Sequence, residues 1–145
     1  MVKGTINIIL VDDSKVFIEG LKILLTNDTN YYVLDTFRNG KELLESPKLS
    51  IADLIIMDIQ MPVMDGIEAA KRVNSEYHNL NMLALTMHLD KVFLEDIIGA
   101  GFKGFIYKPE VPKKLKNVIQ EILDNKFVFP ENLKIKEQNR NGGIL

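Results

Sequence analysis

Four short apolar runs, each followed at once by a charged or hydroxyl side chain, constrain the fold of this chain more than any other feature. The runs and the residues after them are 6–11 with Asp12 and Asp13, 54–57 with Asp58, 82–85 with Thr86, and 104–107 with Lys108. Each run is too short for a helix and rich in aliphatic residues, which is typical of strands buried on both faces. Strand ends in an open parallel sheet line one crevice. We therefore expect three acids, a hydroxyl and an amine to meet there.

The segments between the runs have helical periodicity and turn residues in alternation. We predict strands at 6–11, 31–37, 51–57, 81–85 and 104–107, with helices beginning after Ser14, at 40, at 67, at 91 and near Pro112. Five strand–helix alternations favour an α/β fold, a doubly wound five-stranded parallel sheet with right-handed crossovers and strand order 2-1-3-4-5.

The fourth helix is expected to span 91–100. Its apolar residues Val92, Phe93, Ile97 and Ile98 predict a buried stripe, and Gly101 stands where a C-terminal cap glycine would end the helix.

Composition bounds the class of protein. With 145 residues, 46% hydrophobic and 26% charged, the chain fits one globular domain at 1–125, followed by a tail or linker at 126–145 that we expect to be partly disordered. The net charge of −2 gives no electrostatic footprint for nucleic acid, and the chain contains no cysteine for disulfides or thiolate metal sites. No apolar run has the length of a membrane span, so a cytoplasmic location is expected.

The acids Asp12, Asp13 and Asp58 predict a metal site. Three carboxylates packed together repel one another unless a cation neutralises them. Magnesium is the natural ion, because it takes oxygen ligands and binds through one or two carboxylates together with phosphate. No histidine or cysteine belongs to this predicted cluster, which disfavours zinc and copper.

Asp58 is the candidate nucleophile of this site. An aspartate can attack phosphorus and form an acyl phosphate, provided that cations hold the phosphoryl oxygens. Lys108 would supply one such cation. The Thr86 hydroxyl can bond a phosphoryl oxygen only when that oxygen is present, so Thr86 is a candidate sensor.

These motifs resemble the receiver domain of bacterial two-component response regulators over nearly all of 3–124. The resemblance rests on Asp12-Asp13, on Asp58-Ile59-Gln60-Met61-Pro62 with Asp65-Gly66, on Thr86 and on Lys108-Pro109. The stretches 12–21 and 85–88 are similar to the NarL/LuxR-type subfamily. The resemblance implies a flavodoxin-like (βα)5 fold and a phosphorylation switch rather than an enzyme acting on external substrates.

The resemblance also implies roles for single residues. Asp58 would accept a phosphoryl group from a sensor histidine kinase, and Asp13 and Asp58 would bind Mg2+ directly. Asp12 would bind it through water, and the main-chain carbonyl of Gln60 would complete the protein ligands. Thr86 and Lys108 would then hold the phosphoryl group.

Four positions are implied to control the switch. Phe105 stands at the family's aromatic switch position, and Met87 and His88 are expected to tune access and hydrolysis, as is Gln60. The face made by the last two helices and the last strand would repack, with homodimer formation possible on phosphorylation. The family pattern also gives a cis Lys108–Pro109 bond.

An output module is expected outside this stretch. NarL/LuxR-type regulators carry a helix-turn-helix after the receiver, and the roughly 20 residues after the last helix are too few for one. We therefore expect DNA contact and transcription regulation only through a domain absent from this sequence, or a stand-alone receiver.

Two alternatives remain from the residues alone. One is a Mg2+-dependent phosphatase or phosphotransferase with an aspartate nucleophile, although haloacid-dehalogenase-like enzymes have a second acid where this chain has Gln60. The other is a flavodoxin, although the acidic loop at Asp12 and Asp13 would repel a flavin phosphate.

Overall fold

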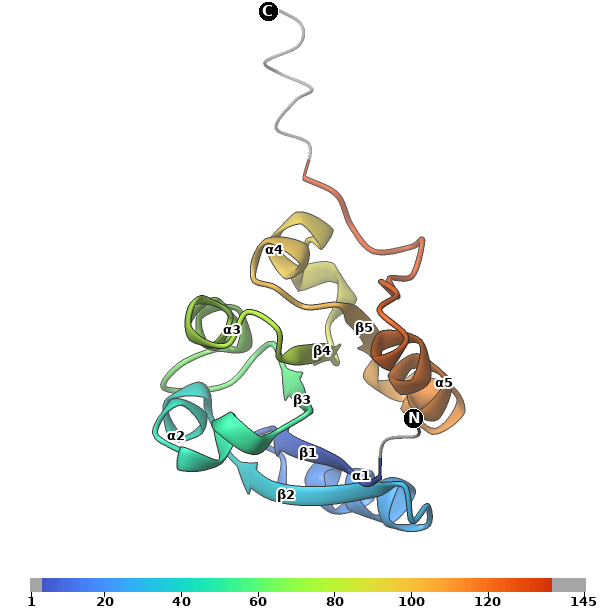
Figure 1. The fold of residues 1–145 in the computed structure, drawn as a ribbon. Helices are drawn as coiled ribbons and strands as arrows, with labels where there is room; N and C mark the ends of the chain where they lie inside the picture. Colours follow the sequence, from blue (N-terminus) through green and yellow to red (C-terminus); the bar gives the residue numbers. More distant parts are fainter. Residues whose placement is uncertain (1–3, 137–145) are drawn as a thin grey trace, which may run out of the picture.

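Five parallel strands form one sheet in the computed structural model of the chain, which describes residues 4–136 (Figure 1). The strands are β1 Ile6–Val11, β2 Tyr31–Phe37, β3 Leu54–Asp58, β4 Asn81–Thr86 and β5 Gly104–Tyr107. They lie in the order β2-β1-β3-β4-β5, and every pairing is parallel. The predicted fold class and strand order are confirmed.

Helices cover both faces of the sheet (Figure 1). They are α1 Lys15–Thr26, α2 Gly40–Leu44, α3 Gly66–Glu76, α4 Leu94–Gly99 and α5 Val111–Leu123, with 3-10 turns at Pro47–Ile51, Leu89–Lys91 and Lys108–Glu110. Apolar residues of α1 and α5 form one core layer with the sheet, and those of α2, α3 and α4 form the other. This arrangement leaves the carboxyl ends of the strands free to form a site.

The central strands are buried on both faces, as their continuous apolar sequence predicts. Along β3, Ile55 and Met57 belong to the layer under α2, α3 and α4, whereas Leu54 and Ile56 belong to the layer under α1 and α5. The side chains of a strand alternate between the two faces, so one run of aliphatic residues supplies both layers.

Side-chain caps fix where three helices begin beside the sheet. Ser14 Oγ accepts a hydrogen bond from the Phe17 amide at 3.2 Å, which starts α1 directly after the β1 acids. Asn39 and Asp65 cap α2 and α3 in the same way. Such caps satisfy amide groups that the first turn of a helix leaves free.

Helix α3 starts against the end of β3. A Cβ atom at Gly66 would clash with the carbonyl oxygen of Asp58 and lie 3.0 Å from the Cα of Ile59. Only glycine therefore allows the β3–α3 loop to pass this close to the strand end. The loop becomes one wall of the site.

The predicted helix at 91–100 is wrong at its start. Helix α4 begins at Leu94, because Val92 and Phe93 adopt extended backbone conformations after the 3-10 turn at Leu89–Lys91. Val92 and Ile97 are buried as predicted, but Ile98 is 47% exposed. Extended β-branched and aromatic residues can point inward at spacings that look helical in sequence. Gly101, with φ of +103°, follows the helix end as expected.

The third strand also starts later than predicted. Residues Pro47–Ile51 form a 3-10 turn that Ser46 caps, and the strand begins at Leu54 rather than at Ile51. Ile51 is 56% exposed, so its aliphatic side chain does not extend the buried run.

Residues 127–136 lie against β5 and α4 (Figure 1). Val128 pairs with Gly104, and Leu133 is only 4% exposed. The sequence predicts 126–145 as a partly disordered tail, whereas this part of it has defined contacts. The expectation for 137–145 lies outside the described residues.

Candidate functional site

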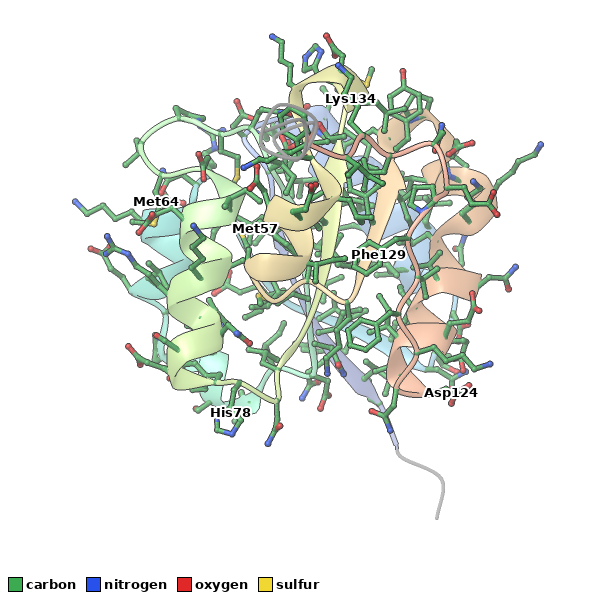
Figure 2. The ribbon with its side chains drawn as sticks, turned by 90° about the horizontal axis from the view of Figure 1, so that it is seen from above. Met57, Met64, His78, Asp124, Phe129 and Lys134 are labelled. Atoms are coloured by element: carbon green, nitrogen blue, oxygen red, sulfur yellow. The ribbon has the colours of Figure 1, made fainter. Side chains whose placement is uncertain are left out.

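The residues that follow the apolar runs meet at the carboxyl edge of the sheet. Val11 stands opposite Met57 in the pairing of β1 with β3, so Asp12 and Asp58 leave neighbouring strands at the same level. Thr86 pairs with Tyr107, which places Lys108 just beyond it. His78 lies at the opposite edge (Figure 2). The predicted convergence of strand ends follows from this register.

Asp12, Asp13 and Asp58 form an acidic cluster. One carboxylate oxygen of each lies within 4.8 Å of the others. Asp12 is 1% exposed and Asp58 is 4% exposed, whereas Asp13 is exposed to solvent. The two buried acids can therefore serve as fixed ligands of a cation, and the exposed Asp13 makes the cluster accessible from solvent.

Lys108 holds the two buried acids together. Its Nζ lies 2.7 Å from Asp12 Oδ2 and 3.2 Å from Asp58 Oδ2, and the side chain is 11% exposed. The same Nζ lies 4.4 Å from the centre of the Phe17 ring of α1, within range of a cation–π contact. The lysine therefore sits in a low-dielectric position between carboxylates and an aromatic face.

The Asp12 carboxylate has one oxygen satisfied by the backbone and one that faces the cluster. Its Oδ1 accepts a hydrogen bond from the Ser14 amide at 2.8 Å. Its Oδ2 has the ion pair with Lys108 but no hydrogen bond of good geometry within the described part of the chain. A buried oxygen with spare acceptor capacity fits a further cation.

Asp58 has a raised pKa. Burial is the largest cause and the charge of Asp12 the second, and together they raise the pKa of Asp58 from 3.8 to about 6. The ion pair and hydrogen bond with Lys108, and the Gln60 amide 3.3 Å from Asp58 Oδ1, oppose this rise. A bound divalent cation would lower the pKa of Asp58 again, because it favours the charged carboxylate.

Thr86 is fully buried, and its hydroxyl both donates and accepts a hydrogen bond. Its Oγ1 donates to Gln60 Oε1 at 2.7 Å and accepts from the His88 amide at 3.1 Å. The resemblance implied a main-chain ligand role and a tuning role for Gln60, but not this side-chain contact with Thr86. The sole sequence signal was an amide side chain two residues after Asp58, and its partner lies 26 residues further along.

The predicted switch and tuning positions differ in burial. Phe105 is 3% exposed and belongs to the core layer under α4. Met87 is 53% exposed and His88 is exposed, both in the loop after β4. The Lys108–Pro109 bond is trans, as are the other peptide bonds of residues 4–136, which corrects the implied cis bond. Trans is the intrinsically preferred form of an X–Pro bond.

A cavity of about 530 Å3 opens beside the cluster. Asp13, Gln60 and Pro62 line it on the strand side, and Lys91 and Phe93 line it on the side of α4. Such a space next to buried carboxylates can admit a small anionic group or the side chain of a partner. Geometry of this kind defines a class: doubly wound parallel-sheet proteins with an acidic site and a lysine at the carboxyl edge.

Comparison with known families identifies this class more closely. The family model described as "Response regulator receiver domain" matches residues 8–120. The chain therefore belongs to the response regulator receiver family, and the resemblance seen in the sequence is confirmed.

Individual relatives agree with this assignment. The chain is 30% identical to the transcriptional regulatory protein LnrK of Bacillus subtilis over 128 residues, which are 88% of this chain and 58% of LnrK. It is also 30% identical over 147 residues to a protein-glutamate methylesterase/protein-glutamine glutaminase of Halalkalibacterium halodurans, covering 99% of this chain and 42% of that protein. The chain thus spans about half the length of these curated relatives.

One solved structure is similar over nearly the whole fold. The crystal structure of a LuxR-family two-component response regulator from Aurantimonas sp. SI85-9A1 superimposes with a TM-score of 0.81 at 26% identity, covering 90% of this chain and 93% of that chain. This likeness agrees with the NarL/LuxR-type resemblance. Among residues 4–136, no helix is long and apolar enough to cross a membrane.

Proposed function

We propose that this receiver is a phosphorylation switch whose phosphoacceptor is Asp58. The observation that carries the proposal is the buried Asp58 carboxylate at the end of β3, 3.2 Å from Lys108 Nζ and within 4.8 Å of two further acids. Receiver family membership supports the same role. A sensor histidine kinase is the donor we expect.

The transfer requires a nucleophile, a leaving group and cations on the phosphoryl oxygens. An Asp58 oxygen attacks phosphorus while the phosphorus–nitrogen bond of the donor phosphohistidine breaks. The electron pair of that bond leaves with the imidazole nitrogen, and the product is an aspartyl phosphate. Lys108 then shifts from the Asp12 and Asp58 carboxylates toward a phosphoryl oxygen.

Mg2+ fits the acidic cluster. Asp12 Oδ2 is buried with spare acceptor capacity, Asp13 is exposed, and oxygen is the donor atom of all three residues. Asp13, Asp58 and the main-chain carbonyl of Gln60 would bind the ion directly, and Asp12 would bind it through water. When bound, Mg2+ would neutralise charge on the phosphoryl oxygens.

Thr86 is the residue that senses the phosphoryl group. Its hydroxyl now donates to Gln60, and it would exchange this partner for a phosphoryl oxygen. The loop after β4, with Met87 and His88, would move with it and alter the face of α4, β5 and α5, where Phe105 is buried. The free energy of the switch is the difference in contacts between the two states.

We further propose that the switch regulates transcription from the cytoplasm through an output domain on a longer protein. Support comes from the similarity to the transcriptional regulatory protein LnrK, of which this chain spans 58%. A homodimer formed on phosphorylation and DNA contact through a helix-turn-helix belong to the same proposal.

The test is phosphorylation by a small donor. The full chain is incubated with Mg2+ and acetyl phosphate, and intact mass is measured. We expect one labile phosphoryl adduct that Asp58→Asn removes and that Asp124→Asn keeps, because Asp124 is exposed at the far edge of the sheet (Figure 2). An adduct that survives Asp58→Asn, or no adduct at all, contradicts the proposal. Steady release of phosphate from phosphate monoesters would instead favour the phosphatase alternative.

A further inference from the structure

The segment 127–136, here called the strap, extends the sheet beyond its last strand. The Val128 amide donates to the Lys103 carbonyl at 2.9 Å, and the Phe105 amide donates to the Val128 carbonyl at 3.0 Å. β5 ends the strand order, so its outer backbone groups would otherwise lack a strand partner. The strap therefore binds the exposed edge of the strand that carries Phe105.

Apolar side chains anchor the strap to the core. Leu133 is 4% exposed and belongs to the same core layer as Phe105, Val92 and Ile97. Phe129 packs against that layer, and Figure 2 shows it on the segment that runs from Asp124 toward Lys134. Burial of Leu133 and packing of Phe129 therefore hold the strap against the core.

The strap also completes the start of α4. Phe93 occupies the N-cap position but makes no side-chain hydrogen bond to the helix. The Leu94 amide donates instead to the Lys134 carbonyl at 2.8 Å. Lys136 donates its amide to the Glu95 carboxylate at 2.9 Å, and its Nζ lies 2.8 Å from Asp96 Oδ1. The first turn of α4 thus depends on backbone and charge contacts from the strap.

The loop between Thr86 and α4 is held as well. Lys134 Nζ donates to the Asp90 carbonyl at 3.2 Å, within the 3-10 turn at Leu89–Lys91. At the other end of this loop, the His88 amide donates to Thr86 Oγ1. The loop between Thr86 and α4 is therefore held at one end by Thr86 of the site and at the other end by the strap.

We propose that the strap is an intramolecular ligand of the β5–α4 face, and that its binding and the occupancy of Asp58 oppose each other. The inference rests on the proposed function. The strap contacts are made to the arrangement in which Thr86 bonds to Gln60, so they stabilise that state. A group on Asp58 that draws Thr86 away moves the loop that the strap holds. Coupling of this kind is reciprocal: release of the strap favours occupancy of Asp58 to the same extent.

The first experiment measures the strap directly in the full chain. Amide hydrogen exchange is followed by NMR with Mg2+ alone and with Mg2+ plus beryllofluoride, a phosphoryl mimic. We expect the amides of Val128, Phe105 and Leu94 to exchange about tenfold faster or more once the mimic is bound. The Asp58→Asn variant, treated in the same way, should show no change.

Two results distinguish failure of this proposal from failure of the proposed function. Unchanged or slower exchange at these amides, in protein whose Asp58 resonances show bound mimic, overturns the strap proposal alone. Absence of any mimic binding that depends on Asp58 overturns the proposed function, and the coupling with it.

The second experiment measures the reciprocal effect. Leu133→Asp places a charge at a buried position, whereas Ile135→Asp makes the same change two residues away at a side chain that is 65% exposed. We expect Leu133→Asp to bind beryllofluoride about tenfold more tightly and Ile135→Asp to match the parent chain within about twofold. Equal affinities for a folded Leu133→Asp variant and the parent contradict the coupling. If Leu133→Asp does not fold, Lys136→Glu takes its place, since it replaces the ion pair with Asp96 by repulsion from Glu95 and Asp96 without burying a charge.

Discussion

The Thr86 hydroxyl donates a 2.7 Å hydrogen bond to the Gln60 side chain, so the proposed sensor of the phosphoryl group already has a partner. Thr86 is fully buried, and its hydroxyl also accepts from the His88 amide. Binding of a phosphoryl oxygen must therefore replace one hydrogen bond by another. The identity of residue 60 sets how much the exchange costs.

Gln60→Ala should favour the phosphoryl-bound state. The substitution removes the competing acceptor, and one such hydrogen bond contributes about 0.5–1.5 kcal/mol net. We expect beryllofluoride affinity, measured by titration with Mg2+ present, to rise by roughly twofold to tenfold. In the Thr86→Ala background, the same Gln60→Ala change should have little effect, which a double-mutant cycle measures. An equal effect in both backgrounds would show that Gln60 acts by another route.

Lys108→Met should destabilise the metal-free protein at neutral pH. The change leaves Asp12 and Asp58 buried without their cation, and breaking a buried pair on one side costs about 3–5 kcal/mol when no group can adjust its protonation. Protonation of Asp58 relieves part of this, so we expect a loss of about 2–3 kcal/mol in urea unfolding with a chelator present. Lys116→Met is the control, since its pair with Asp28 is 4.0 Å long and partly exposed to solvent. It should change stability by less than about 1 kcal/mol.

The same Lys108→Met variant should bind Mg2+ more tightly than the parent. In the parent, the Lys108 ammonium group competes with the ion for the Asp12 and Asp58 carboxylates. Removing this positive charge should therefore raise the affinity of the site for a divalent cation. Calorimetric titration with Mg2+ measures the change. Weaker binding in a folded Lys108→Met variant would mean that the lysine positions the ligands rather than competing with the ion.

Gly66→Ala should damage the site through the backbone. A Cβ atom there meets the carbonyl oxygen of Asp58, so either β3 or the start of α3 must move. We expect a loss of about 2–4 kcal/mol in the free energy of unfolding, together with weaker Mg2+ binding. Gly20→Ala is the matched control, because a Cβ at Gly20 in α1 meets nothing within 4 Å. It should stabilise the protein by about 0.5–1 kcal/mol.

The sequence predicted the sheet and the site for one physical reason. A strand buried on both faces is a continuous apolar run, and it ends where a polar residue must reach solvent or a partner, as at Asp58 and Thr86. Strand ends in a parallel sheet share one edge, so the same boundary located both the elements and the cluster. Periodicity failed at α4, where the buried Val92 and the half-buried Phe93 are extended rather than helical.

Contacts between side chains that are distant in the sequence could not be predicted from it. Gln60 and Thr86 are ordinary loop and strand residues until the fold brings the amide to the hydroxyl. Leu133 lies in the tail that the sequence predicts to be partly disordered, and its burial in the core accompanies strap contacts to the free edge of β5 and the uncapped start of α4. Both contacts depend on which backbone groups the fold leaves without partners.

Asp58→Asn should stabilise the metal-free protein, by an amount that depends on pH. The pKa of Asp58 is about 6 in the folded chain against 3.8 ordinarily, so the folded state binds more protons than the unfolded state between these values. Stability therefore falls as pH rises through this window, and the full cost is present above about pH 6. Asparagine carries no charge, so the variant avoids the free-energy cost of burying an ionised carboxylate. We expect the Asp58→Asn variant to be more stable than the parent by about 3 kcal/mol at pH 7.5 and by about 1 kcal/mol at pH 4.5.

Urea unfolding followed by circular dichroism, with a chelator at each pH, measures this difference. Asp124→Asn, at an exposed acid, should follow the parent at every pH. A difference between Asp58→Asn and the parent that stays constant from pH 4.5 to 7.5 would show that the gain does not come from the Asp58 charge. Added Mg2+ should then stabilise the parent more than Asp58→Asn, since the carboxylate that destabilises the free site is a ligand for the ion.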